Sequence, residues 1–282
     1  MSARAGAALR VLAWLVATVV VLLVAGGAIQ AGGLGTVTGY ALFDLGLLLV
    51  SFAAWRILEK RRPAETPLAL DRRSGRGFLR GAALGALLVG LVVAVLALTG
   101  AYELAPRACR TEPLVRFLAW TGAFVLLAAL FEEALFRGFA LFALRDLAGP
   151  IAAAAVTGIL FALGHQANPG FGPLAIVNLA VVGAVLAAWV LLERDVWIAV
   201  GAHAGWNGAI VAGAAVPVSG LALPAPCHAG ILSGPAWWTG GVFGLEAGVP
   251  TTVVWLGLAW WLRRSARGPE DTAPSQAPPG RA

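Results

Sequence analysis

The sequence predicts an all-α, polytopic membrane bundle of about eight transmembrane helices, and three observations support that prediction. Of 282 residues, 60% are apolar and only 12% are charged, about half the charged fraction of an ordinary soluble domain. Apolar stretches recur along the chain, and a helix of about 20 such residues crosses the hydrocarbon core of a bilayer. No segment alternates apolar and polar residues as barrel strands do. Because backbone groups in hydrocarbon must be bonded internally, these stretches are predicted to be helices.

The expected spans follow one another along the chain, and polar or Gly/Pro-containing segments separate them. The first follows Arg4 and Arg10, and its apolar run is longer than the core of a signal peptide, so we expect it to remain as an anchor. A basic segment divides the second span from the third, and Gly149-Pro150 marks the turn between the fourth and the fifth. The spans are predicted at 11–32, 36–55, 79–100, 117–146, 150–167, 171–192, 195–215 and 247–262.

The basic residues predict the orientation of the chain. Lys and Arg number 20 against 14 Asp and Glu, which gives a net charge of +6. With the N-terminus inside, most of the basic residues fall in cytoplasmic segments, as the positive-inside rule expects. No nucleic-acid-binding motif accompanies them, so we expect no nucleic-acid partner. We predict a multi-pass protein of the plasma (cytoplasmic) membrane with both termini cytoplasmic, a membrane-embedded domain over residues 1–264 and a disordered tail over 265–282.

The two cysteines lie on the opposite, exoplasmic side in this threading. Cys109 follows the third span, and Cys227 lies in a loop rich in Gly and Pro over about 216–246. An oxidising compartment permits a bridge between them. Two unpaired thiols are the other interpretation, and the sequence leaves both open.

Away from the ends of the predicted spans, six ionisable residues fall inside them, where a charge costs several kcal/mol and marks a functional candidate. Asp44 has no basic residue near it in sequence, and we interpret it as a packed or protonated residue rather than a catalytic one. The others fall in the fourth, fifth and seventh spans. The six are Asp44, Glu132, Glu133, Arg137, His165 and His203.

The fourth span contains two adjacent acids and one base. Glu133 and Arg137 are four residues apart with the acid first, which favours an ion pair on one helix face. Glu132 points about 100° away from Glu133. We therefore interpret Glu133 and Arg137 as a buried structural pair and Glu132 as a free carboxylate. A solvated charge cluster at the membrane edge is the alternative.

The two histidines each have a partner one helical turn away. Phe161 precedes His165 by four residues, and His203 precedes Asn207 by four. Glu132 and His165 lie at nearly equal distances along the chain from the turn at Gly149, so antiparallel helices bring them to similar depth. His203 lies closer to its inner turn, and a tilt or a recessed loop is needed to bring it to the same level.

A Glu, two His and an Asn suit hydrolysis. A carboxylate and an imidazole together hold and deprotonate water, and an imidazole and a carboxamide donate hydrogen bonds to an oxyanion. The same Glu132, His165 and His203 also match a His2Glu zinc site with an open position for water. There is no His-Glu-x-x-His helix. Either a metal-free or a metal-assisted route to peptide hydrolysis fits these residues.

These residues resemble the CPBP intramembrane proteases, which include the CAAX prenyl endopeptidases and proteins of bacteriocin processing and self-immunity. The family motifs are Glu-Glu-x-x-x-Arg, Phe-x-x-x-His and His-x-x-x-Asn, and this chain carries them in order within a protease core of about 115–215. The resemblance implies an intramembrane metalloendopeptidase with Glu132 as general base, aided by His165, and with His203 and Asn207 polarising the scissile carbonyl. A divalent metal such as zinc is an open part of that expectation.

The expected partners are the lipid bilayer and a peptide or membrane-anchored, lipidated protein as substrate. The resemblance does not specify which substrate, or whether it is prenylated. Two rival hypotheses stay open: a proton- or metal-coupled transporter that uses the buried Glu and His residues, and a non-catalytic bacteriocin-immunity or scaffold membrane protein. No repeated halves are visible in the sequence, which disfavours the transporter.

Overall fold

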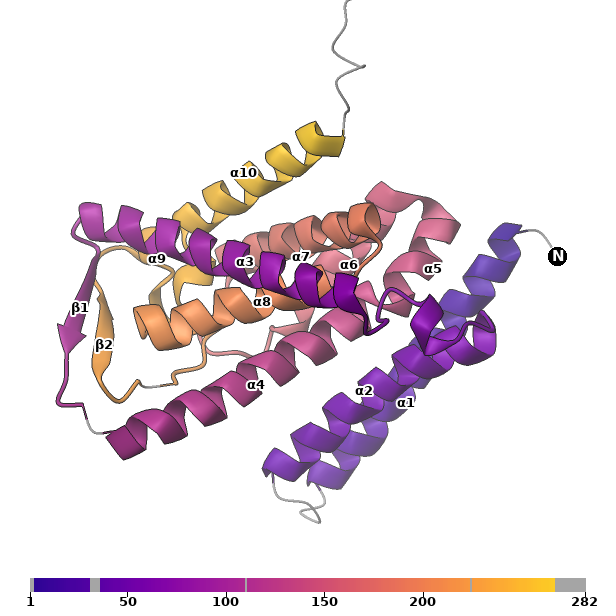
Figure 1. Cartoon of the computed structure of the whole chain (residues 1–282), viewed down its shortest axis with the longest axis horizontal. Helices are drawn as coiled ribbons and strands as arrows, with labels where there is room; N and C mark the ends of the chain where they lie inside the picture. Colours follow the sequence, from indigo (N-terminus) through magenta and orange to yellow (C-terminus); the bar gives the residue numbers. More distant parts are fainter. Residues whose placement is uncertain (1–2, 31–35, 110, 224, 267–282) are drawn as a thin grey trace, which may run out of the picture.

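The chain folds into a bundle of helices, as its composition predicts (Figure 1). A computed structural model describes residues 3–30, 36–109, 111–223 and 225–266. Helices lie at all the expected spans, the fourth of which is divided in two. Within the described residues, four helical segments are long and apolar enough to cross a membrane. The helices are α1 (Ala3–Gln30), α2 (Thr36–Leu58), α3 (Arg72–Leu98), α4 (Thr111–Arg137), α5 (Phe139–Ala148), α6 (Pro150–Gly164), α7 (Pro173–Glu193), α8 (Trp197–Gly208), α9 (Ala236–Thr239) and α10 (Val249–Ala266).

The predicted fourth span consists of two helices, because the chain breaks at Gly138 between α4 and α5. A Cβ at this position would lie 2.1 Å from the carbonyl oxygen of Ala134, so only glycine fits the break. The break comes directly after Arg137, the last residue of α4. It therefore ends the helix of the Glu-Glu-x-x-x-Arg motif at the motif itself.

A small two-stranded sheet, which the sequence did not predict, joins the α3–α4 connection to the segment after α8. Strand β1 (Tyr102–Pro106) pairs antiparallel with β2 (His228–Leu232). Directly beyond the paired residues, Cys109 and Cys227 form a disulfide bond. The structure thus joins the two cysteines that the sequence left either bridged or free. In Figure 1 the sheet lies at the end of the bundle away from the α2–α3 connection.

Helices α3 and α8 pack closely against each other through glycines. Gly77, Gly81 and Gly85 of α3 face α8, and a Cβ on Gly81 would lie 2.1 Å from the carbonyl oxygen of Ile198. Gly201 of α8 makes the reciprocal approach, since its Cβ would lie 2.0 Å from the carbonyl oxygen of Phe78. Small residues at such spacings let membrane helices approach closely. This contact fixes the helix that carries His203.

The α1–α2 hairpin packs against α4 and α5 beside this bundle (Figure 1). Ser51 of α2 donates a hydrogen bond to the carbonyl oxygen of Ala134 at 2.9 Å. Trp55 packs edge-to-face on Phe139 with ring centroids 5.3 Å apart. The hairpin thus braces the helix break beside the motif. The side chain of Asp44 lies outside the described residues, as does most of the expected tail.

Candidate active site

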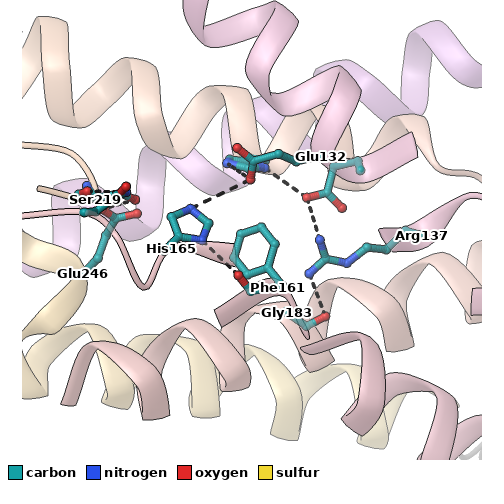
Figure 2. A network of polar contacts seen from close by, with 10 residues as sticks. Glu132, Arg137, Phe161, His165, Gly183, Ser219 and Glu246 are labelled. Atoms are coloured by element: carbon teal, nitrogen blue, oxygen red, sulfur yellow. Dashed lines mark hydrogen bonds and ion pairs between the residues drawn. The ribbon is translucent and has the colours of Figure 1, made fainter. Parts of the chain in front are cut away.

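Glu133 and Arg137 form a fully buried ion pair in the last turns of α4. Arg137 Nη1 donates to Glu133 Oε1 at 3.0 Å, and both side chains are 0% exposed. Arg137 Nη2 donates to the carbonyl oxygen of Gly183 on α7 at 3.1 Å (Figure 2). Gly183 lets the guanidinium approach, because a Cβ there would lie 2.9 Å from Nη2. The pair therefore connects α4 to α7.

Glu133 has a second partner that the sequence analysis missed. His203 Nδ1 lies 3.0 Å from Glu133 Oε1, the oxygen that also accepts from Arg137. Because the partner is a carboxylate, this Nδ1 carries the hydrogen. Glu133 thus orients the His203 ring in addition to pairing with Arg137.

His165 is oriented in the same way by its own helix. Its Nδ1 donates to the carbonyl oxygen of Phe161 at 2.9 Å, where α6 ends. With Nδ1 of both rings bonded, each histidine presents Nε2 to the interior of the site. This arrangement fixes the orientation of both rings.

Both Nε2 atoms face Glu132. Glu132 Oε2 lies 3.9 Å from His165 Nε2 and 4.0 Å from His203 Nε2. These distances exceed a direct hydrogen bond and suit bridging by a single water. His203 therefore reaches the level of His165 despite its shorter distance along the chain from the inner turn. Glu132 is 34% exposed, whereas its neighbour Glu133 is fully buried, which makes Glu132 the accessible carboxylate of the two.

Phe161 packs between the ion pair and the histidines. The Arg137 guanidinium lies 4.5 Å from the centroid of the Phe161 ring. The same ring lies 4.9 Å from the His165 ring and 5.8 Å from the His203 ring. The phenylalanine of the Phe-x-x-x-His motif thus forms the apolar wall that holds both imidazoles and shields the buried arginine.

Asn207 lies in the wall of a cavity next to His203. Among the described residues, no hydrogen bond reaches its buried Oδ1, and none joins it to Glu132 or His165. The cavity extends from the histidine toward α7 and α10. It is lined by Phe161, Leu179, Val182, Leu186, His203, Trp206, Asn207, Ser219, Glu246 and Trp255.

Two residues of this cavity, Ser219 and Glu246, come from the segment between α8 and α10, which the sequence analysis treated only as an outer loop. Glu246 Oε2 accepts hydrogen bonds from the Ser219 hydroxyl at 2.9 Å and from the Ser219 backbone N–H. Burial raises the pKa of the Glu246 carboxyl. One signal was available in the sequence: Glu246 is the only acid between Asp195 and Glu270.

Glu132, His165 and His203 carry the donor types of a His2Glu zinc site, and both histidines have the second partners typical of metal ligands. As placed, however, the described residues contain no group of three or more His, Cys, Asp or Glu that could hold one ion. The geometry fits a bridging water better than a shared metal. Together the site offers two candidate bases, Glu132 and His165, while His203 and the Asn207 carboxamide line the adjoining cavity.

Comparison with known proteins agrees with the motifs. The sequence model of the family described as Type II CAAX prenyl endopeptidase Rce1-like matches residues 114–209, about a third of the chain. The matched segment runs from α4 to α8 and contains all three motifs, whereas Ser219 and Glu246 lie outside it. No curated protein and no solved structure matches the chain. Residues 114–209 are therefore similar to the Rce1-like type II CAAX prenyl endopeptidases, which agrees with the resemblance that the motifs carry.

Proposed function

We propose that the protein is an intramembrane endopeptidase that hydrolyses a peptide bond in a membrane-associated or lipidated protein or peptide. The observation that carries the proposal is the convergence of His165 Nε2 and His203 Nε2 on Glu132 Oε2 at 3.9 and 4.0 Å. In the proposal one water bridges Glu132 Oε2 to the two Nε2 atoms. The family match supports a protease in general.

In this proposal Glu132 and His165 act on the water. The water donates a hydrogen bond to Glu132, and its oxygen attacks the scissile carbonyl carbon as its proton passes to the carboxylate or the imidazole. The Phe161 carbonyl accepts from His165 Nδ1, so in the neutral ring Nε2 carries the lone pair that takes the proton. When the carbon–nitrogen bond breaks, the same proton is delivered to the leaving amine.

His203 and Asn207 stabilise the oxyanion. The Glu133 carboxylate accepts from His203 Nδ1, and in the proposed mechanism the protonated ring donates from Nε2 to the carbonyl oxygen. The Asn207 carboxamide supplies a second donor from the same helix face. Because the site is buried among helices, these dipoles act in a medium of low dielectric constant, where they are more effective than in water.

Two substitutions test this mechanism in the full-length protein reconstituted into lipid vesicles. The probe is a quenched fluorescent peptide with a farnesylated Cys-aliphatic-aliphatic-X terminus, compared with the same peptide lacking the prenyl group. We expect Glu132→Gln and His165→Ala each to slow cleavage about 100-fold or more while the thermal unfolding temperature stays near that of the wild type. Retained cleavage in both folded variants would contradict the proposal.

The same vesicles separate this function from its rivals. Proton or metal-ion flux that depends on Glu132, without peptide cleavage, would identify a transporter. A bacteriocin-immunity phenotype that survives Glu132→Ala would identify a non-catalytic immunity or scaffold protein. Mass spectrometry of membrane fractions from cells with wild-type or Glu132→Gln protein identifies natural substrates by their altered termini.

Metal dependence is tested by removing metal ions with a chelator and then adding zinc back. Zinc, if bound, would be held by Glu132, His165 and His203, which requires these three side chains to move closer together than the structure places them. We expect cleavage to persist after dialysis against a chelator. Loss of cleavage that zinc alone restores, together with a stoichiometric zinc content, would assign a metalloprotease mechanism instead.

A further inference from the structure

The Glu246–Ser219 pair lines the cavity, although neither residue belongs to the three motifs. Both backbones are anchored by asparagines: Asn168 Nδ2 donates to the Ser219 carbonyl oxygen at 2.8 Å. Asn178 Nδ2 donates to the carbonyl oxygens of Glu246 and Gly248 at 2.8 and 2.9 Å. The segment before α10 is therefore fixed against α7 and the α6–α7 connection, with its one carboxylate at the cavity wall.

Glu246 is buried without a cation. It is 6% exposed, and no Lys or Arg of the described residues forms an ion pair with it. Both hydrogen bonds from Ser219 reach Oε2, and none from the described residues reaches Oε1. A buried carboxylate paired only with neutral donors is costly, and an amide or an apolar side chain would fill the same space at lower cost. That cost points to a use for the carboxylate beyond packing.

The carboxylate faces the catalytic groups. It shares the cavity wall with His203 and Asn207. Figure 2 shows the Glu246–Ser219 pair on the side of His165 away from Glu132.

The site is rich in acceptors that have no donor. Glu132 Oε2 and Asn207 Oδ1 are buried and receive no hydrogen bond from the described residues, and Glu246 Oε1 adds a third free acceptor. A peptide backbone brings N–H donors, each of which needs an acceptor once it leaves water. Each of these acceptors can take an N–H group of a bound peptide.

We propose that Glu246, held by Ser219, is a substrate-binding residue whose Oε1 accepts a hydrogen bond from a backbone N–H of the bound peptide. This inference rests on the proposed peptidase function and adds a recognition element to the same site. Glu132 and His165 act on the water and His203 and Asn207 on the carbonyl oxygen, whereas Glu246 fixes the peptide strand by its amide hydrogen.

Glu246→Gln tests this role because it removes the carboxylate but keeps the size and shape of the side chain. The Ser219 N–H and O–H groups donate to the oxygen of the glutamine side chain. Its NH2 group therefore faces the cavity and cannot accept from a peptide N–H. We measure peptide dissociation constants in vesicles in the Glu132→Gln background, where hydrolysis is blocked. The farnesylated peptide above is used with each backbone N–H in turn replaced by an ester oxygen.

We expect Glu246→Gln to weaken binding about tenfold or more. We also expect one ester replacement to weaken binding to the Glu132→Gln protein by a similar factor but to change binding to the double variant less than about threefold, because the two changes remove the same hydrogen bond. Absence of such coupling at every position, with Glu246→Gln folded, would overturn the inference.

Thr251→Ala is the matched control for a merely structural role. The Thr251 hydroxyl is buried and donates to the Leu245 carbonyl oxygen at 2.6 Å, in the same turn as Glu246 but not in the cavity wall. It should lower the unfolding temperature and leave the dissociation constant unchanged. If Glu246→Gln and Ser219→Ala behave like Thr251→Ala, the pair is a structural latch and the inference is wrong.

The outcomes also separate this inference from the proposed function. Wild-type cleavage with no coupling at Glu246 would leave the peptidase intact and overturn only the binding role. Coupled binding without any wild-type cleavage would overturn the peptidase and retain the recognition site. No measurable binding by folded protein would count against both.

Discussion

At the scale of single residues, Gly183 is needed because its missing side chain leaves room for the Arg137 guanidinium. A Cβ at Gly183 would lie 2.9 Å from Arg137 Nη2 and 2.7 Å from Gly158 Cα, so Gly183→Ala displaces either the guanidinium or α6. We expect a loss of about 1–3 kcal/mol in stability and reduced cleavage, measured by thermal unfolding and by the peptide assay. Gly122→Ala is the control, since nothing lies within 4 Å of its Cβ.

The two adjacent glutamates are expected to respond differently to substitution. Glu133→Ala leaves Arg137 buried without its carboxylate and His203 without its orienting partner. Removing one member of a buried pair costs about 3–5 kcal/mol, so we expect low yield and a lower unfolding temperature, whereas Glu132→Gln stays folded and inactive. A stable but inactive Glu133→Ala protein would show that Glu133 acts in catalysis rather than in folding.

The residues that the sequence could identify are those with fixed spacing. Motif positions within one helix, such as Glu133 and Arg137, are set by the helical repeat and are readable from the chain. The contact of Glu133 with His203, the approach of Arg137 to Gly183 and the place of Glu246 in the cavity all join distant segments. These depend on tertiary packing, which helical periodicity does not encode.

At the scale of helices, the α3–α8 contact controls the position of His203. A Cβ on Gly81 would lie 2.1 Å from Ile198 O and 2.7 Å from Ala202 N, both backbone atoms of α8. Unlike a side chain, the backbone cannot relieve this clash by changing rotamer. Gly81→Ala should therefore separate the helices, lower the unfolding temperature and reduce cleavage. Gly90→Ala, in open space on the same helix, should do neither.

The turn between α7 and α8 predicts a pH dependence. Burial raises the pKa of the Asp195 carboxyl, so the folded chain binds more protons than the unfolded chain between the two pKa values, and its stability falls as pH rises through that window. Asp195→Asn removes this penalty and keeps an acceptor for the Trp197 N–H, 2.9 Å away. We expect the variant to unfold at an equal or higher temperature at pH 7, and the difference to disappear near pH 4. A less stable variant at pH 7 would contradict this.

The elements themselves were predictable to differing degrees. Long apolar runs predicted helices at every expected span, because length and composition suffice for them. The break at Gly138 was not predicted. A single glycine in an apolar run does not show that a side chain there would clash with the Ala134 carbonyl oxygen. Strands β1 and β2 are short and pair across more than a hundred residues, so no local pattern indicated them.

At the scale of the whole molecule, the Cys109–Cys227 bond links segments separated by 118 positions. Closing a loop of this length in the unfolded chain stabilises the fold by about 4–5 kcal/mol on chain-entropy grounds. We expect reduction, or the Cys109→Ala/Cys227→Ala double variant, to lower the unfolding temperature substantially. Alkylation with and without reductant, followed by mass spectrometry, checks the bond, and two thiols labelled without reductant would contradict it.

That bond also gives the chain an unusual connectivity. Residues 109–227 form a covalently closed ring that contains every motif residue and Ser219, while Glu246 and α10 belong to a tail outside it. A nick anywhere within the ring leaves its pieces attached to one another, whereas a cut between β2 and α10 releases Glu246 and Trp255 while sparing all three motifs. Limited proteolysis can therefore sever the chain on one side of the cavity while the covalent ring that carries the motifs stays closed.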